Sequence, residues 1–223
     1  MLKTPVIVLN VKTYIEATGN KALEIAMLMD KVSKELGASM VIAVQATDIS
    51  LVAKKVSLPV FAQHIDPIIP GSYTGWTLAE AVKAAGAIGT LINHSEHRLI
   101  LADLDNCIIR AKELDLDHIV CSNNAQTSKA IAAFSPNFVA VEPPELIGGD
   151  ISVTTADPDI VSNSVDAVKS ISNKVKVLCG AGIKNGKDVT KAVELGADGV
   201  LLASGVVKAK DKEAVVRDLA SGL

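Results

Sequence analysis

The stretch Glu35-Leu-Gly-Ala-Ser-Met-Val-Ile-Ala-Val44 contains the unit from which much of this sequence is built: a helix end, a glycine and a strand. Closely similar phrases occur at residues 83–93 (KAAGAIGTLIN) and 194–203 (ELGADGVLLA). Glycine just past a helix is a common stop signal because it adopts the left-handed conformation without strain. The continuous apolar run that follows is typical of a parallel strand covered on both faces. The repeated phrase therefore predicts alternating helices and parallel strands.

Eight apolar runs of strand length occur along the chain. They are Pro5–Asn10, Ser39–Val44, Leu58–Ala62, Ala87–Asn93, Leu116–Cys121, Asn137–Glu142, Val175–Gly180 and Asp198–Ala203. Helical spacing of apolar residues is clear in Asn20–Leu36, Leu78–Ala85 and Lys187–Leu195. Eight strand–helix units in 223 residues predict an α/β fold, a single (β/α)8 barrel domain over residues 1–223 with a compact helical layer. An open doubly wound sheet is the alternative, and the lack of an edge-like strand favours closure.

The composition argues against several classes of protein. A formal net charge of -3 and an aromatic content of 3% predict no nucleic-acid partner. No stretch approaches the roughly 20 apolar residues that span a bilayer, and the N-terminus lacks the apolar segment of a signal peptide. We therefore expect a cytoplasmic protein without a membrane partner. Cys107, Cys121 and Cys179 are widely spaced and odd in number, which indicates buried reduced thiols.

Polar side chains stand at the ends of several predicted strands, where barrels carry their chemistry. Taken singly, Lys12 is typical of a solvated lysine, Asn10 of a turn residue and His94 of a structural histidine. Glu142 is different, because a carboxylate that ends an apolar strand loses part of its hydration. Desolvation makes a carboxylate a better proton acceptor, which suits a general base.

Glycine-rich segments follow the last two strands and indicate a phosphate site. Gly180-Ala-Gly182 and Ala203-Ser-Gly205 present backbone N–H groups with little side chain in the way. In barrels this pair of loops often binds phosphate together with the N-terminus of a short helix. The cluster around Glu96 also holds two histidines, but no third ligand of a suitable kind lies nearby, so we expect no metal.

The combined motifs resemble those of the triosephosphate isomerase family. They are Asn10-Val-Lys12, Asn93-His-Ser-Glu-His-Arg98 and Glu142-Pro-Pro-Glu-Leu-Ile-Gly148, each at the end of a strand and in the family's order. The second motif reads HSEHR where HSERR is usual in the family, and the chain is short. In these respects the sequence is similar to the compact archaeal branch, whose members commonly form tetramers. The resemblance therefore implies a homo-oligomer, with a tetramer favoured over a dimer.

The resemblance implies interconversion of dihydroxyacetone phosphate and D-glyceraldehyde 3-phosphate through an enediolate, in glycolysis and gluconeogenesis, without cofactor or metal. It assigns Glu142 as the base, His94 as the electrophile and Lys12 as the source of positive charge. It further implies that the substrate is oriented by Asn10 and that the phosphate is bound by Ile147, Gly148, Gly182, Ala203 and Ser204. Glu96 is either a structural residue or a partner of Lys12. This family is itself the standard case of a neutral catalytic histidine beside a closing loop.

Two further expectations concern the neighbourhood of these residues. Ser95 to Arg98 resembles a helix start, which would place His94 at a positive helix end and favour its neutral ring. Tyr73 and Trp76, in the segment Gly71–Thr77, either form an assembly contact or pack on their own barrel. The competing functions are another phosphate-binding barrel enzyme, such as a phosphosugar epimerase, and a non-catalytic phosphometabolite-binding protein.

Overall fold

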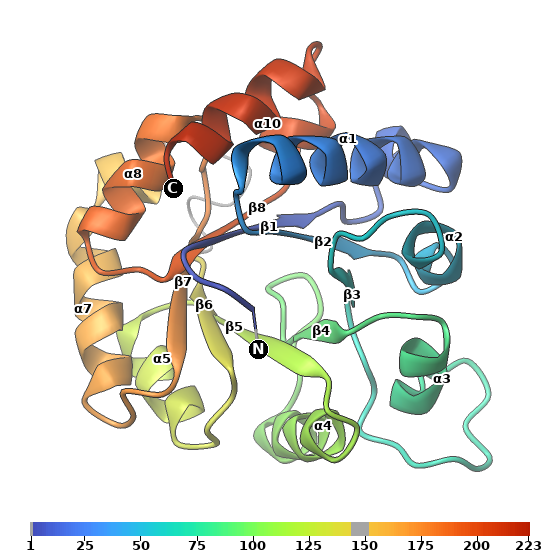
Figure 1. Ribbon diagram of the computed structural model, residues 1–223. Coiled ribbons are helices and arrows are strands. Elements are labelled where there is room, and N and C mark those ends of the chain that lie inside the picture. The colour runs from blue at the N-terminus through green and yellow to red at the C-terminus, as the bar shows by residue number, and fades with distance from the viewer. Residues whose placement is uncertain (1, 144–151) are drawn as a thin grey trace.

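The computed structural model describes residues 2–143 and 152–223, and these form a closed barrel of parallel strands (Figure 1). The strands are β1 (Val6–Asn10), β2 (Met40–Val44), β3 (Val60–Ala62), β4 (Gly89–Ile92), β5 (Asp117–Ser122), β6 (Phe138–Val141), β7 (Lys176–Gly180) and β8 (Gly199–Leu202). Each strand pairs with the next along the chain, and β8 pairs with β1. The predicted (β/α)8 barrel is therefore confirmed, and the open sheet was the wrong alternative.

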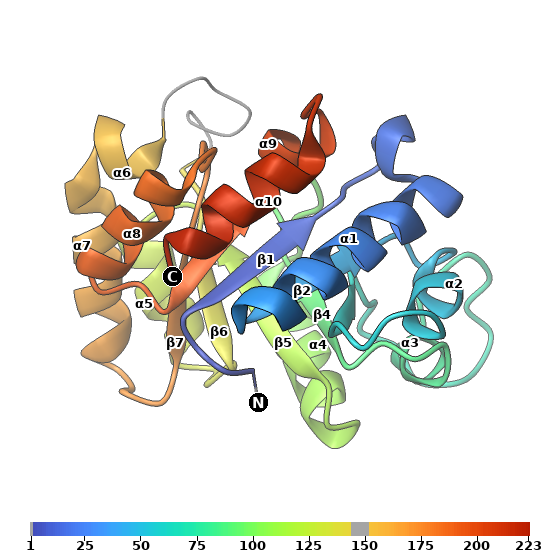
Figure 2. The same cartoon turned by 45° about the horizontal axis from the view of Figure 1, so that its top comes forward.

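Helices surround the barrel as an outer layer (Figure 1). They are α1 (Asn20–Leu36), α2 (Ile49–Ala53), α3 (Ala79–Ala84), α4 (Leu101–Glu113), α5 (Ala125–Ala132), α6 (Val153–Ala156), α7 (Pro158–Lys169), α8 (Gly186–Glu194), α9 (Ser204–Val207) and α10 (Lys212–Ser221), with a 3-10 turn η1 (Ile15–Ala17). The predicted helix Asn20–Leu36 has the bounds of α1, and Gly37 caps it with φ 66°. Figure 2 shows α6 and α9 at the end of the barrel opposite the N-terminus.

The core has two layers because successive strand residues point to opposite faces. In β1, Val6 and Val8 belong to the cluster inside the barrel, whereas Ile7 and Leu9 pack under the helices. Both layers are formed by fully or nearly fully buried side chains. In each strand every second residue points into the barrel. The last of these inward-pointing residues lies at the carboxyl end of the strand and therefore faces the mouth of the barrel.

Outside this core, large apolar side chains lie in the segment after β3. Tyr73 is 43% exposed and Trp76 is 51% exposed, and their rings contact each other at a centroid distance of 5.9 Å. Neither is buried against its own barrel, and their role in assembly stays a prediction. Within the described residues, no helix is long and apolar enough to cross a membrane.

Candidate active site

The carboxyl ends of β1, β4, β6, β7 and β8 surround one cavity. Most of the residues expected at the site line it: Asn10, Lys12, His94, Glu142, Gly182, Ala203 and Ser204. Glu96 lines an adjoining cavity that shares Asn10, Lys12 and His94 with the first. Ile147 and Gly148, the remaining expected phosphate contacts, lie outside the described residues. The fold thus brings together groups that are up to about two hundred residues apart in the sequence.

Lys12 reaches the cavity from an unusual backbone conformation. Its φ of 50° lies in the left-handed region, and its N–H donates to Asn10 Oδ1 at 3.0 Å, which closes a tight turn directly after β1. Its Nζ donates to Glu96 Oε1 at 2.7 Å, and its side chain is only 13% exposed. The turn and the ion pair together hold the ammonium group beside the cavity.

His94 has a defined tautomer. The backbone N–H of Glu96 donates to His94 Nδ1 at 3.2 Å, so Nδ1 accepts and carries no hydrogen. The nearest carboxylate oxygen of Glu96 is 3.6 Å from Nδ1, while the same carboxylate is hydrogen-bonded to Lys12. A ring that accepts at Nδ1 is neutral and carries its hydrogen on Nε2, which makes Nε2 a hydrogen-bond donor toward the cavity.

The expectation that His94 stands at a helix start is wrong. Residues 95–97 form a turn, and α4 begins only at Leu101. The reason is Asn93, which has φ 61° and whose Oδ1 accepts the N–H of Leu99 at 2.9 Å, closing a separate loop before the helix. Arg98 Nη1 donates to the carbonyl of Asn93 at 2.7 Å and strengthens that loop. A single amide, and not a helix dipole, therefore contacts Nδ1 of the ring.

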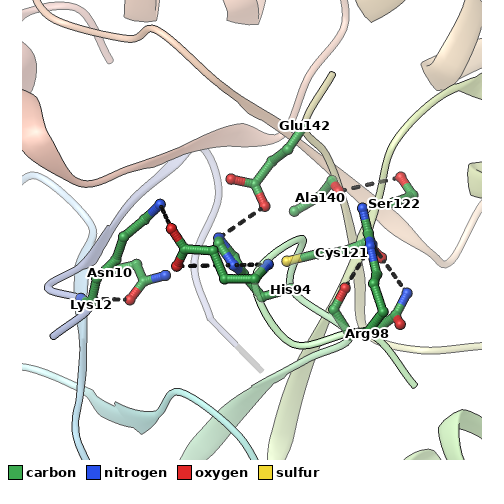
Figure 3. Close-up of polar contacts among 10 residues, drawn as sticks. Asn10, Lys12, His94, Arg98, Cys121, Ser122, Ala140 and Glu142 are labelled. Carbon is green, nitrogen blue, oxygen red and sulfur yellow. Dashed lines mark hydrogen bonds and ion pairs between the residues drawn. The ribbon is translucent and has the colours of Figure 1, made fainter. Parts of the chain in front are cut away.

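Glu142 lies directly opposite the histidine (Figure 3). Its N–H donates to Ser122 O at 2.8 Å, which continues the β5–β6 pairing by one residue. The Oε2 atom of Glu142 is 3.5 Å from His94 Nε2, and both side chains are 7% exposed. Among the described residues neither atom has a hydrogen-bond partner. A buried acceptor and a buried donor are therefore left facing the cavity, where a ligand can pair with both.

The glycine-rich ends of β7 and β8 form the other wall. Ala181 and Gly182 have φ values of 74° and 73°, in the left-handed region, and this turn leaves backbone amides near the cavity. After the adjacent strand β8, α9 begins at Ser204, with Ala203 as its N-cap. The first backbone amides of a helix have no acceptor within the helix. Lys184 and Tyr14 also line the cavity, and Lys208 Nζ lies 4.7 Å from the centroid of the Tyr14 ring.

Several residues of the site are not indicated by the sequence. Tyr14 and Lys184 carry no motif of their own, although Lys184 follows the glycine-rich segment by two positions. Asn93 is part of the family motif, but its left-handed backbone has no unambiguous sequence signal. Over residues 2–143 and 152–223, no group of three or more His, Cys, Asp or Glu side chains is arranged to hold a metal ion.

Comparison with known proteins gives a consistent result. A family model described as triosephosphate isomerase matches residues 5–219. A protein named triosephosphate isomerase from Methanobrevibacter smithii is 55% identical over 222 residues, which cover all of both chains. One from Methanocaldococcus jannaschii is 56% identical over 213 residues, covering 96% of this chain and 97% of that protein. One from Methanothermus fervidus is 54% identical over 215 residues, with the same coverage.

A closed barrel whose mouth holds a carboxylate and an imidazole, in a chain with such relatives, defines a TIM-barrel isomerase. The match to the family model spans nearly the entire chain, and the identity to the archaeal proteins exceeds one half. The chain belongs to the triosephosphate isomerase family.

Proposed function

We propose that this protein interconverts dihydroxyacetone phosphate and D-glyceraldehyde 3-phosphate with Glu142, His94 and Lys12 as its catalytic residues. The observation that carries the proposal is the pair of unpartnered buried atoms, His94 Nε2 and Glu142 Oε2, 3.5 Å apart at the cavity. A substrate carbon acid and its neighbouring oxygen require one base and one hydrogen-bond donor side by side.

Glu142 would act first, as the base. Its carboxylate takes a proton from the carbon next to the carbonyl of dihydroxyacetone phosphate, and the electron pair of that C–H bond forms the C=C bond of an enediolate. Glu142 then returns the proton to the neighbouring carbon, which yields the aldehyde. The carboxylate is suited to this role because it is nearly free of water and because the free oxygen Oε2 faces the cavity.

His94 and Lys12 would stabilise the charge that develops on the substrate oxygens. The Nε2–H of His94 donates to the carbonyl oxygen and then moves a proton between the two oxygens of the enediolate. Lys12 Nζ supplies positive charge, Asn10 orients the same end of the substrate, and Glu96 holds Lys12 through their 2.7 Å contact. Such preorganised groups in a buried site are usually the largest contribution to catalysis.

The phosphate would lie against the glycine-rich wall. Amides near Gly182 and at the start of α9, by Ala203 and Ser204, would donate to its oxygens. We propose that Ile147 and Gly148 complete this binding from the segment after Glu142, as in the family. A phosphate held in this way fixes the reacting carbons beside Glu142, which is the effect of orientation on rate.

Glu142→Gln tests the proposal, because glutamine keeps the shape of the side chain and removes the base. In a coupled assay with glyceraldehyde 3-phosphate we expect kcat to fall by at least about 100-fold, the usual effect of losing a general base. Competitive inhibition by inorganic phosphate should persist, and deuterium from the solvent should enter the product of the unsubstituted enzyme. Turnover close to that of the unsubstituted enzyme in the variant would refute the assignment and favour a phosphometabolite-binding protein or a different barrel chemistry.

The wider setting is also proposed. We propose that residues 1–223 act as a single domain, in glycolysis and gluconeogenesis, in the cytoplasm, and as a homo-oligomer in which a tetramer is favoured. Size-exclusion chromatography with light scattering checks the last point, and a monomer at micromolar concentration would contradict it.

A further inference from the structure

Gly180 is the last residue of β7 and lies beside the proposed base. The β6–β7 register pairs Val141 with Cys179, so the next position along each strand brings Glu142 next to Gly180. A Cβ placed on Gly180 would lie 2.4 Å from Glu142 Cγ, 3.1 Å from its Cδ and 3.2 Å from its Oε1. Carbon atoms in ordinary contact are about 3.5–4.0 Å apart. The side chain of Glu142 therefore occupies the space that any other residue at position 180 would fill.

The opposite side of Glu142 is closed. Its N–H is bound to Ser122 O at 2.8 Å, and the side chain of Cys121, which precedes Ser122 on β5, is completely buried in the barrel interior. Burial and, secondly, the charge of the Glu142 carboxylate raise the pKa of the Cys121 thiol, in agreement with their proximity. The space on the β5 side of the carboxylate is thus occupied, whereas on the β7 side Gly180 has no side chain and leaves room for it.

We propose that Gly180 is a positioning residue for the isomerase reaction: by lacking a side chain it lets Glu142 lie over β7, with Oε2 facing His94 Nε2. This inference rests on the proposed function of Glu142. The backbone conformation does not require a glycine at this position. The φ of Gly180 is not in the left-handed region, so an alanine there meets no conformational strain.

The size of the effect follows from the overlap. To restore an ordinary contact, Glu142 Cγ must move by about 1 Å from a Cβ at position 180. A displacement of about 1 Å in a catalytic group costs on the order of 100-fold in rate. Phosphate binding should change little, because its proposed contacts at Gly182, Ala203 and Ser204 do not include the Cα of Gly180.

The test begins with Gly180→Ala and the coupled assay. We expect kcat to fall about 100-fold, with the inhibition constant of inorganic phosphate unchanged within a factor of about two. Gly71→Ala is the matched control, since its added methyl would make only ordinary contacts, with the Tyr73 ring at 3.4 Å and the Ile69 carbonyl at 3.9 Å, and Gly71 does not line the site. This control should keep the kcat of the unsubstituted enzyme. A Gly180→Ala enzyme with unchanged kcat would overturn the inference.

A double-mutant cycle separates steric positioning from general loss of structure. Glu142→Ala removes the Cγ atom that the new methyl would meet. Gly180→Ala should therefore lower the free energy of unfolding in the presence of Glu142, whereas in the Glu142→Ala background it should leave it unchanged or raise it slightly, because alanine restricts the unfolded chain more than glycine does. Equal destabilisation in both backgrounds would overturn the inference. If instead Glu142→Gln keeps full turnover, the proposed function itself fails, and the two failures are thereby distinguished.

Discussion

Asn93 offers a quantitative test of how the histidine loop is held. Its side chain is nearly buried and makes two hydrogen bonds, from Nδ2 to Cys121 O at 2.9 Å and from the Leu99 N–H to Oδ1 at 2.9 Å. Its φ of 61° lies in the left-handed region. Asn93→Gly keeps that conformation and loses both bonds, whereas Asn93→Ala loses both bonds and also meets the strain of its Cβ.

The magnitudes follow from these contacts. Each hydrogen bond contributes about 1 kcal/mol, so we expect Asn93→Gly to lower the free energy of unfolding by about 2 kcal/mol. The left-handed conformation costs alanine about 1–2 kcal/mol, and the greater freedom of glycine in the unfolded chain offsets about 0.4–1 kcal/mol of that difference. Asn93→Ala should therefore be less stable than Asn93→Gly by about 1 kcal/mol.

Urea denaturation followed by circular dichroism measures these differences, and the coupled assay reports the effect on the site. Asn137→Ala is a suitable control: it removes one bond, from the His118 N–H to Asn137 Oδ1 at 3.0 Å, at the opposite end of β5. It should cost about 1 kcal/mol and leave kcat unchanged, because the amino end of a barrel serves stability. The reasoning would be refuted if Asn93→Ala were as stable as Asn93→Gly, or if both matched the unsubstituted protein.

Two further predictions concern buried titratable groups. Burial raises the pKa of the Cys107 thiol to about 12 and raises the pKa of the Cys121 and Cys179 thiols as well. The folded protein should therefore not react with Ellman's reagent at pH 8, whereas the protein unfolded in guanidinium should show three reactive thiols per chain. Rapid reaction of the native protein would contradict this. Burial also lowers the pKa of His118 below its usual 6.5, while its Nδ1–H donates to Leu116 O. As the pH falls, His118 is therefore protonated in the unfolded chain at a higher pH than in the folded protein. The contribution of this group to the free energy of unfolding is greatest above pH 6.5 and decreases below it, by at most about 1.4 kcal/mol per pH unit. His118→Asn, which keeps the donor, should have a smaller loss of unfolding free energy between pH 7.5 and 5.5, and an unchanged loss would be inconsistent with the reasoning.

The barrel itself could be predicted because its signals are local. A glycine that ends a helix and an apolar run that follows it both occur within about ten residues, and α1 was located to its bounds in this way. Even the inward direction of Glu142 follows from the strand period, since Phe138 and Ala140 belong to the cluster inside the barrel. Side-chain alternation along a strand is enforced by the backbone geometry and is hardly altered by the neighbours.

The surroundings of the site could not be predicted because they depend on contacts between segments that are distant in the sequence. The turn after His94 was mistaken for a helix start, since the hydrogen bond from the Leu99 N–H to Asn93 Oδ1 competes with helix formation and leaves no clear pattern. The role proposed for Gly180 depends on where the side chain of Glu142 lies, and that position depends on β5 and β7 together. Such information is absent from any short stretch of the chain.

The strand β5 illustrates the same limit from the backbone side. It contributes none of the proposed catalytic side chains, yet it stands between β4, which leads to His94, and β6, which leads to Glu142. The carbonyl of Cys121 accepts hydrogen bonds from the Asn93 side chain and, at 3.3 Å, from Arg98, while the next carbonyl, that of Ser122, accepts the N–H of Glu142. Two consecutive carbonyls therefore tie the histidine loop and the base to one short, buried segment. Because every residue has a carbonyl, this tie restrains the distance between the two groups without constraining the side chains of β5, and no sequence motif can reveal it.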